Sequence, residues 1–163
     1  MRVIIATLAV LLSFAAHAQD AAYCYQVKVD TKHKLSLKKQ EESIVKFKLT
    51  NCSGQDLLID KNAATEYESP KAALFFKVYR CEEDCVPYAV KKQYYQKVSD
   101  TVPYIIRPGF SYTYEFPLFE LYRIAEPGTY KLVGCYRRQV PGNDGQPVDY
   151  LVESEGVEIT VTK

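Results

Sequence analysis

The sequence contains few of the residues from which most catalytic and metal sites are built. It has two histidines, no tryptophan and a single methionine, Met1. Its formal net charge is only +1, which argues against a nucleic-acid-binding protein, because such proteins carry a strongly basic face. Beyond the N-terminus, no apolar run approaches the roughly 20 residues that a membrane-spanning helix needs. We therefore expect neither nucleic-acid binding nor a membrane span.

The N-terminal residues have the pattern of a cleavable secretory signal. Met1 and Arg2 precede an apolar run at residues 3–12, and Ala16-His17-Ala18 has the small-x-small pattern of a cleavage site. Cleavage after Ala18 would leave residues 19–163, which we expect to form one domain in the periplasm or outside the cell. Cys24 lies too far downstream of this site for a lipoprotein anchor.

Loss of the signal would leave one histidine, His33, between Lys32 and Lys34. A Ser-His-Asp or Cys-His site would have to use it, and a zinc site usually needs several Cys or His ligands. We therefore expect no catalytic residue, no cofactor and no metal. One enzymatic alternative stays open, because two carboxylates distant in the sequence could converge in a hydrolase.

Alternation of apolar and polar residues dominates the rest of the chain. This period-2 pattern and the β-branched and aromatic content are typical of half-buried strands, and turn signals such as residues 141–145 (PGNDG) separate them. The expected helices are short, at residues 117–124 and 62–68. We predict an all-β, disulfide-stabilised, immunoglobulin-like antiparallel β-sandwich of about seven to nine strands. The strands expected are residues 23–30, 43–51, 57–59, 73–79, 86–90, 110–116, 129–137 and 157–161.

Residues 126–130 (EPGTY) indicate a tyrosine corner before the penultimate strand. Antibody domains place a cysteine two residues after this tyrosine, whereas here Cys135 follows Tyr130 by five. The pattern therefore favours an immunoglobulin-like sandwich over an antibody-type domain.

Five cysteines are an odd number for an exported protein, so at least one thiol stays unpaired within the monomer. Cys81 and Cys85 flank a three-residue loop between two expected strands, and we predict a disulfide between them. Cys24, Cys52 and Cys135 fall toward the same end of the expected sandwich. We favour Cys52–Cys135, with Cys24 free, only slightly over Cys24–Cys52.

Tyrosine is the most prominent residue that remains, with fourteen copies. It is enriched at protein interfaces, although it is also an ordinary strand residue. A disulfide at the 81–85 loop would present three carboxylates to a partner. The candidate protein-binding residues are Tyr94, Tyr95, Tyr104, Tyr112, Tyr114, Glu82, Glu83 and Asp84.

Three segments with turn motifs follow one another in the order found in a known scaffold. They are residues 51–59 (NCSGQDLLI), 107–116 (RPGFSYTYEF) and 126–132 (EPGTYKL). This arrangement resembles small exported bacterial immunoglobulin-like sandwich proteins, and it is similar to the intracellular proteinase inhibitor domains of bacilli. The resemblance implies a fold and no particular function. No inhibitor loop can be carried over residue by residue.

Export and the scarcity of catalytic residues together favour a non-enzymatic protein that binds another protein, such as an immunity protein or an enzyme inhibitor. The alternatives are an accessory domain of an envelope assembly (a pilus or a secretion apparatus), the carboxylate-dependent hydrolase, and a ligand-binding sandwich.

Overall fold

The computed structural model describes residues 23–60, 72–88, 103–142 and 144–163. The expected signal peptide and the expected helix at residues 62–68 lie outside these ranges. Within them the regular structure is mostly β-strand, with one 3₁₀ turn, η1 (Gln40–Glu42), and one helical turn, α2 (Leu118–Leu121). The strands are β1 (Tyr25–Thr31), β2 (Lys34–Ser36), β3 (Ile44–Asn51), β4 (Leu57–Asp60), β5 (Ala72–Cys81), β6 (Cys85–Pro87), β7 (Pro103–Ile106), β8 (Ser111–Pro117), β9 (Gly128–Pro141), β10 (Pro147–Glu153) and β11 (Val157–Thr162).

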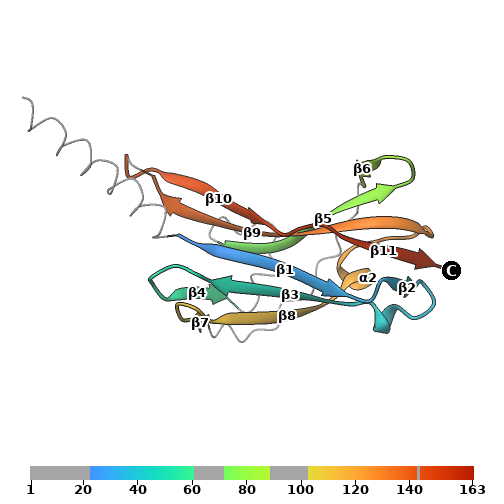
Figure 1. Ribbon diagram of the computed structural model, residues 1–163, viewed down its shortest axis with the longest axis horizontal. Helices are drawn as coiled ribbons and strands as arrows, with labels where there is room; N and C mark the ends of the chain where they lie inside the picture. Colours follow the sequence, from blue (N-terminus) through green and yellow to red (C-terminus); the bar gives the residue numbers. More distant parts are fainter. Residues whose placement is uncertain (1–22, 61–71, 89–102, 143) are drawn as a thin grey trace, which may run out of the picture.

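The strands form three sheets, and neighbours are antiparallel except for the β2–β11 pair (Figure 1). The first sheet has the order β1-β3-β8. The second has the order β2-β11-β9-β5-β6, with β10 also paired to β9. The third is the small ribbon β4–β7. The expectation of an all-β chain with antiparallel sheets is confirmed.

Aromatic side chains hold the first two sheets together. Phe76 of the second sheet lies edge-to-face against Phe47 and Phe116 of the first, with ring centroids 5.8 Å and 5.6 Å apart. Val45, Phe47 and Leu49 are fully buried, whereas the lysines between them on β3 are exposed. The period-2 pattern therefore predicted the core-facing side of β3 correctly.

The N-terminal part of the described chain contributes one strand to each of the two larger sheets. β1 pairs with β3 in the first sheet, and after Lys32 and His33 the chain joins the second sheet as β2, parallel to β11. The Thr160 N–H donates to the carbonyl of His33 at 2.8 Å, which fixes this crossing. β2 was not expected, because three residues are too few to establish a periodic pattern.

Two further strands were missed, and one helix is shorter than expected. β7 and β10 complete ribbons with β4 and β9. α2 ends at Leu121 because Tyr122 returns to extended backbone, which lets its hydroxyl accept a hydrogen bond from the Phe76 N–H at 2.7 Å. A tertiary contact therefore ends the helix.

The tyrosine corner forms as the sequence predicted. Tyr130 is fully buried at the start of β9, and its hydroxyl donates to the carbonyl of Glu126 at 2.8 Å. Burial raises the pKa of Tyr130 to about 12, so the hydroxyl keeps its proton and remains a donor. The bond ties the turn before β9 to the strand itself.

The two sheets approach each other closely at Gly134. A Cβ atom there would lie 2.5 Å from Val29 Cγ2 and 3.0 Å from Phe47 Cε2, closer than van der Waals contact permits. Absence of a side chain on β9 at this point lets β1 and β3 pack directly against it.

Tyr130→Phe should lower the free energy of unfolding by about 1 kcal/mol, the usual net contribution of a hydrogen bond. Urea denaturation of both proteins measures the difference. Tyr23→Phe is the matched control, since the Tyr23 hydroxyl has no partner among the described residues, and it should change stability by less than about 0.5 kcal/mol. Equal stability of wild type and Tyr130→Phe would contradict the corner.

Gly134→Ala should destabilise the protein by about 1–3 kcal/mol, because the added methyl group forces the sheets apart. Gly54→Ala is the control, since a Cβ there meets nothing within 4 Å. A Gly134→Ala protein as stable as the control would contradict the close approach.

Candidate functional site

The hairpin between β5 and β6 lies near one end of its sheet, where it rises away from β9 and β11 (Figure 1). A disulfide joins Cys81 to Cys85, with their Cα atoms 4.0 Å apart. Glu82, Glu83 and Asp84, which lie between them, are all exposed. The structure thus brings together the three carboxylates that the sequence analysis proposed for this loop.

Arg80 stabilises one side of this hairpin. Its guanidinium forms an ion pair with Glu82 at 3.4 Å and another with Glu126 in the turn before β9. Glu83 and Asp84 form no ion pair with any described residue. The hairpin therefore presents two uncompensated carboxylates on a covalently closed loop, beside an open hollow of about 510 Å³ that Val86 also lines.

Of the tyrosines proposed as a binding face, Tyr112 and Tyr114 have described side chains, and both turn toward the core. Tyr114 is buried and Tyr112 is half-buried, and their rings lie 4.6 Å apart on the core-facing side of β8. The expectation for Tyr114 is therefore wrong, because the alternation of β8 directs it inward with Phe116. Tyr104 lies on β7, but only its backbone is described. Tyr94 and Tyr95 lie outside the described residues.

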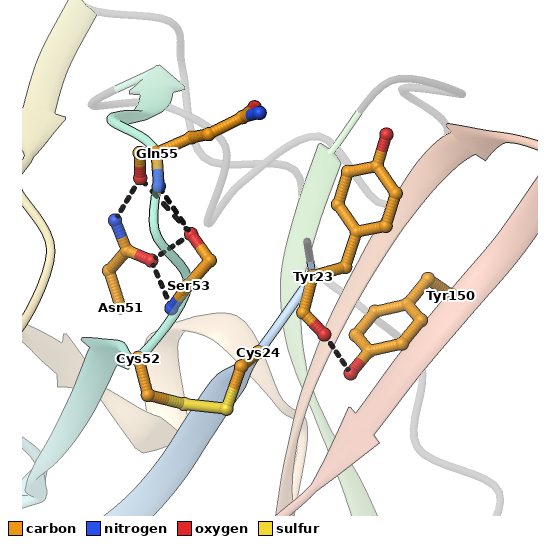
Figure 2. The surroundings of a disulfide bond; sticks show 7 residues. All are labelled: Tyr23, Cys24, Asn51, Cys52, Ser53, Gln55 and Tyr150. Carbon is orange, nitrogen blue, oxygen red and sulfur yellow. Dashed lines mark hydrogen bonds between the residues drawn. A yellow bond between two sulfur atoms is a disulfide. The ribbon is translucent and has the colours of Figure 1, made fainter. Parts of the chain in front are cut away.

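The remaining disulfide joins Cys24 to Cys52, so the favoured Cys52–Cys135 pairing is wrong (Figure 2). Gly134 faces β1 and β3 across the core, and successive residues of a strand point to opposite faces. Cys135 consequently points away from the sheet that carries Cys52. The expected pairing rested on the end of the sandwich that each cysteine occupies and not on the face to which it points.

Cys135 is a buried free thiol beneath an ion pair between Lys77 and Glu153. Its Sγ lies 3.6 Å from the carbonyl oxygen of Val133. Burial raises the pKa of the thiol to about 11, and the thiolate is the reactive form of cysteine. Its burial and its raised pKa both disfavour reaction of the Cys135 thiol in the folded protein.

Asn51 organises the chain beside the Cys24–Cys52 disulfide (Figure 2). Its side-chain amide donates to the carbonyls of Gln55 and Ile106, both at 2.7 Å, and its oxygen accepts from the N–H and the hydroxyl of Ser53. Every polar atom of this fully buried side chain is used. Asn51 thus has a structural role, fixing the ribbon of β4 and β7 to the end of β3.

A second constellation, which the sequence analysis missed, lies at the same end of the molecule. Arg138 on β9 donates to the hydroxyl of Tyr25 on β1 at 2.9 Å. Tyr136 lies two residues earlier on the same face of β9, and Tyr150 on β10 is opposite Arg138. Three tyrosines from three strands surround one arginine, which sequence spacing could not reveal.

Two other surface features stand out among the described residues. A groove of about 530 Å³ runs between β1 and the β10–β11 segment, lined by residues 25–29 and 152–157. On the small ribbon, Leu58 and Ile105 lie opposite each other and are 59% and 58% exposed. The latter is an apolar cross-strand pair open to solvent.

His33 lies exposed at the β1–β2 crossing, where its Nδ1 is 3.3 Å from the carbonyl oxygen of Glu158. The described part of the chain brings together no group of three or more His, Cys, Asp or Glu residues that could hold a metal ion. It also contains no helix of the length and apolarity that a bilayer span requires.

Two comparisons of the chain with known proteins found no match. No protein-family model matches it, and no curated protein sequence matches it significantly. Any function must therefore be argued from the chain itself.

The disulfide assignment predicts that unreduced protein contains two bridges and one thiol. Peptide mapping by mass spectrometry should find Cys24–Cys52 and Cys81–Cys85 peptides, and a thiol reagent should label Cys135 only after unfolding. Rapid labelling of the native protein, or a Cys52–Cys135 peptide, would contradict the assignment.

Proposed function

We propose that this chain is an immunoglobulin-like β-sandwich, exported to the periplasm or secreted, that binds another protein and catalyses no reaction. The strand arrangement supports the fold assignment. β1, β3 and β8 share one sheet and β5, β9 and β11 the other, as the A, B, E and C, F, G strands of that architecture do. The tyrosine corner on β9 occupies the corresponding F strand.

The cysteines set this sandwich apart from antibody domains. The core bridge of those domains joins strands B and F of opposite sheets, whereas Cys24–Cys52 joins neighbouring strands of one sheet. Two disulfides are nonetheless in keeping with an oxidising compartment, as is the secretory pattern at residues 1–18.

The β5–β6 hairpin carries the binding proposal. Binding loops work best when they are exposed and already ordered, because less conformational entropy is lost on association. A disulfide closes this loop, Arg80 anchors its base, and Glu83 and Asp84 remain without cationic partners among the described residues. A basic surface on the partner would supply the complementary charge and accelerate association.

An accessory role in an envelope assembly is the second candidate, and the groove between β1 and β10–β11 favours it. Within the described strands, β1 hydrogen-bonds only to β3 and β10 only to β9, so each presents an open edge. An extended segment of a neighbouring subunit could pair with such an edge. A partner that is an assembly subunit, and that is retained when the hairpin is altered, would favour this candidate.

The hairpin carboxylates can be tested by converting all three to amides. The E82Q/E83Q/D84N variant keeps both cysteines and the loop length, so the fold should persist. Immobilised wild type should capture a periplasmic protein, and the variant should capture at least about tenfold less of it. Exposed charges at an interface strongly affect the rate of association. Quantitative mass spectrometry of the same captured protein provides the measurement.

A control variant with the same change in net charge, E41Q/E120Q/E158Q, alters exposed carboxylates elsewhere and should capture as much as wild type. High salt should weaken capture by wild type, since exposed charges are screened. Equal capture by the two triple variants would remove the hairpin from the interface.

A further inference from the structure

Arg138 is a half-buried cation that no carboxylate in the described part of the chain compensates. It points to the inner face of β9, as Tyr136 and Val140 do, toward β1. Its described hydrogen bond goes to the neutral hydroxyl of Tyr25 at 2.9 Å, and no described carboxylate forms an ion pair with it. A charge that is partly removed from water is unfavourable unless a counter-charge or further hydrogen bonds replace the lost hydration.

Tyr136 adds an unsatisfied donor to the same place. Its side chain is fully buried, and its hydroxyl donates its proton to no described residue. Burial raises the pKa of this hydroxyl, and the nearby Arg138 guanidinium opposes the rise through its charge and its capacity to donate to the phenol oxygen. An orphaned buried hydroxyl costs stability unless something accepts its proton.

The Tyr25 hydroxyl is also free to donate. It accepts from Arg138 and donates its own proton to no described residue. Burial raises the pKa of Tyr25 against the opposing effect of Arg138, so the phenol stays protonated near neutral pH. Two phenol protons and one guanidinium therefore come together from β1 and β9, which face each other across the two sheets.

The surrounding rings hold these donors in position. Tyr25 lies edge-on to Tyr136 at 5.3 Å and to Tyr150 at 5.9 Å. The Tyr150 hydroxyl donates to the carbonyl of Tyr23 at 3.0 Å, close to the Cys24–Cys52 disulfide (Figure 2). The frame is thus covalently and sterically restrained, which favours binding because little ordering remains to be done.

We propose that Arg138, with the hydroxyls of Tyr25 and Tyr136, forms a binding site for a carboxylate. A guanidinium matches the two oxygens of a carboxylate in a bidentate geometry. One negative charge balances the single uncompensated positive charge, and the carboxylate's remaining lone pairs accept the two phenol protons. The carboxylate belongs either to an acidic side chain of a protein or to a small organic acid, and the site does not depend on the proposed role of the hairpin.

Titration of the disulfide-intact protein with sodium acetate tests the site directly. The Nε–Hε resonances of ¹⁵N-labelled arginines are recorded at pH 7, with sodium chloride keeping the ionic strength constant. The Arg138 signal, identified by its loss in Arg138→Gln, should shift in a saturable manner. The Arg107 signal should show no such shift, because Arg107 is an exposed arginine in the turn before β8.

Two variants separate binding from folding. Tyr136→Phe should weaken acetate binding about tenfold, as expected for loss of a hydrogen bond to a charged group. Its melting temperature without acetate should be equal to that of wild type or higher, because the variant removes an unsatisfied hydroxyl. Arg138→Lys keeps the positive charge but loses the planar guanidinium that contacts both carboxylate oxygens, so it should also weaken acetate binding.

A pair of capped peptides distinguishes the two sources of carboxylate. Acetyl-Ala-Glu-Ala-amide binding at least about tenfold more tightly than acetate, with no binding of its Gln counterpart, would assign the site to a protein side chain. Equal binding of acetate and the Glu peptide would assign it to a free carboxylate. The proposal is overturned if Arg138 shifts no more than Arg107 with either probe, or if Tyr136→Phe binds as wild type does.

Discussion

The close approach of β9 to β1 and β3 at Gly134 is the constraint on which the rest of the structure depends. With no side chain at this position, Val29 and Phe47 rest directly on the β9 backbone. The aromatic contacts of Phe76 with Phe47 and Phe116 follow from the sheet separation that this allows. It also fixes which residues of β9 face the core, because an inward-facing Gly134 requires its two chain neighbours to face outward.

This alternation decides the surroundings of the reactive and polar side chains on β9. Cys135 is directed to the outer face of its sheet, away from Cys52, and remains a buried thiol with a pKa raised by burial. Tyr136 and Arg138 are directed inward, at the end of the core where Tyr25 meets them. One glycine therefore separates a buried thiol from a cluster of hydrogen-bond donors.

The two candidate binding regions lie on different parts of the fold and have opposite charge. The β5–β6 hairpin presents carboxylates on a disulfide-closed loop, supported by Arg80. The Arg138 cluster places a guanidinium and two phenol hydroxyls between β1, an edge strand of one sheet, and β9, an interior strand of the other. Each is restrained by a nearby disulfide, so neither depends on a long flexible loop for its geometry.

The sequence by itself determined the all-β class, most strands, the tyrosine corner and the 81–85 loop, because period-2 alternation, turn residues and short cysteine spacing are local signals. β2, the end of α2 at Tyr122, the burial of Tyr114 and the Cys24–Cys52 pairing were decided only by the tertiary structure. So was the meeting of Arg138 with Tyr25, which are 113 residues apart. Such features depend on which face each strand turns to its neighbour, and strand packing sets that face, whereas local propensity does not.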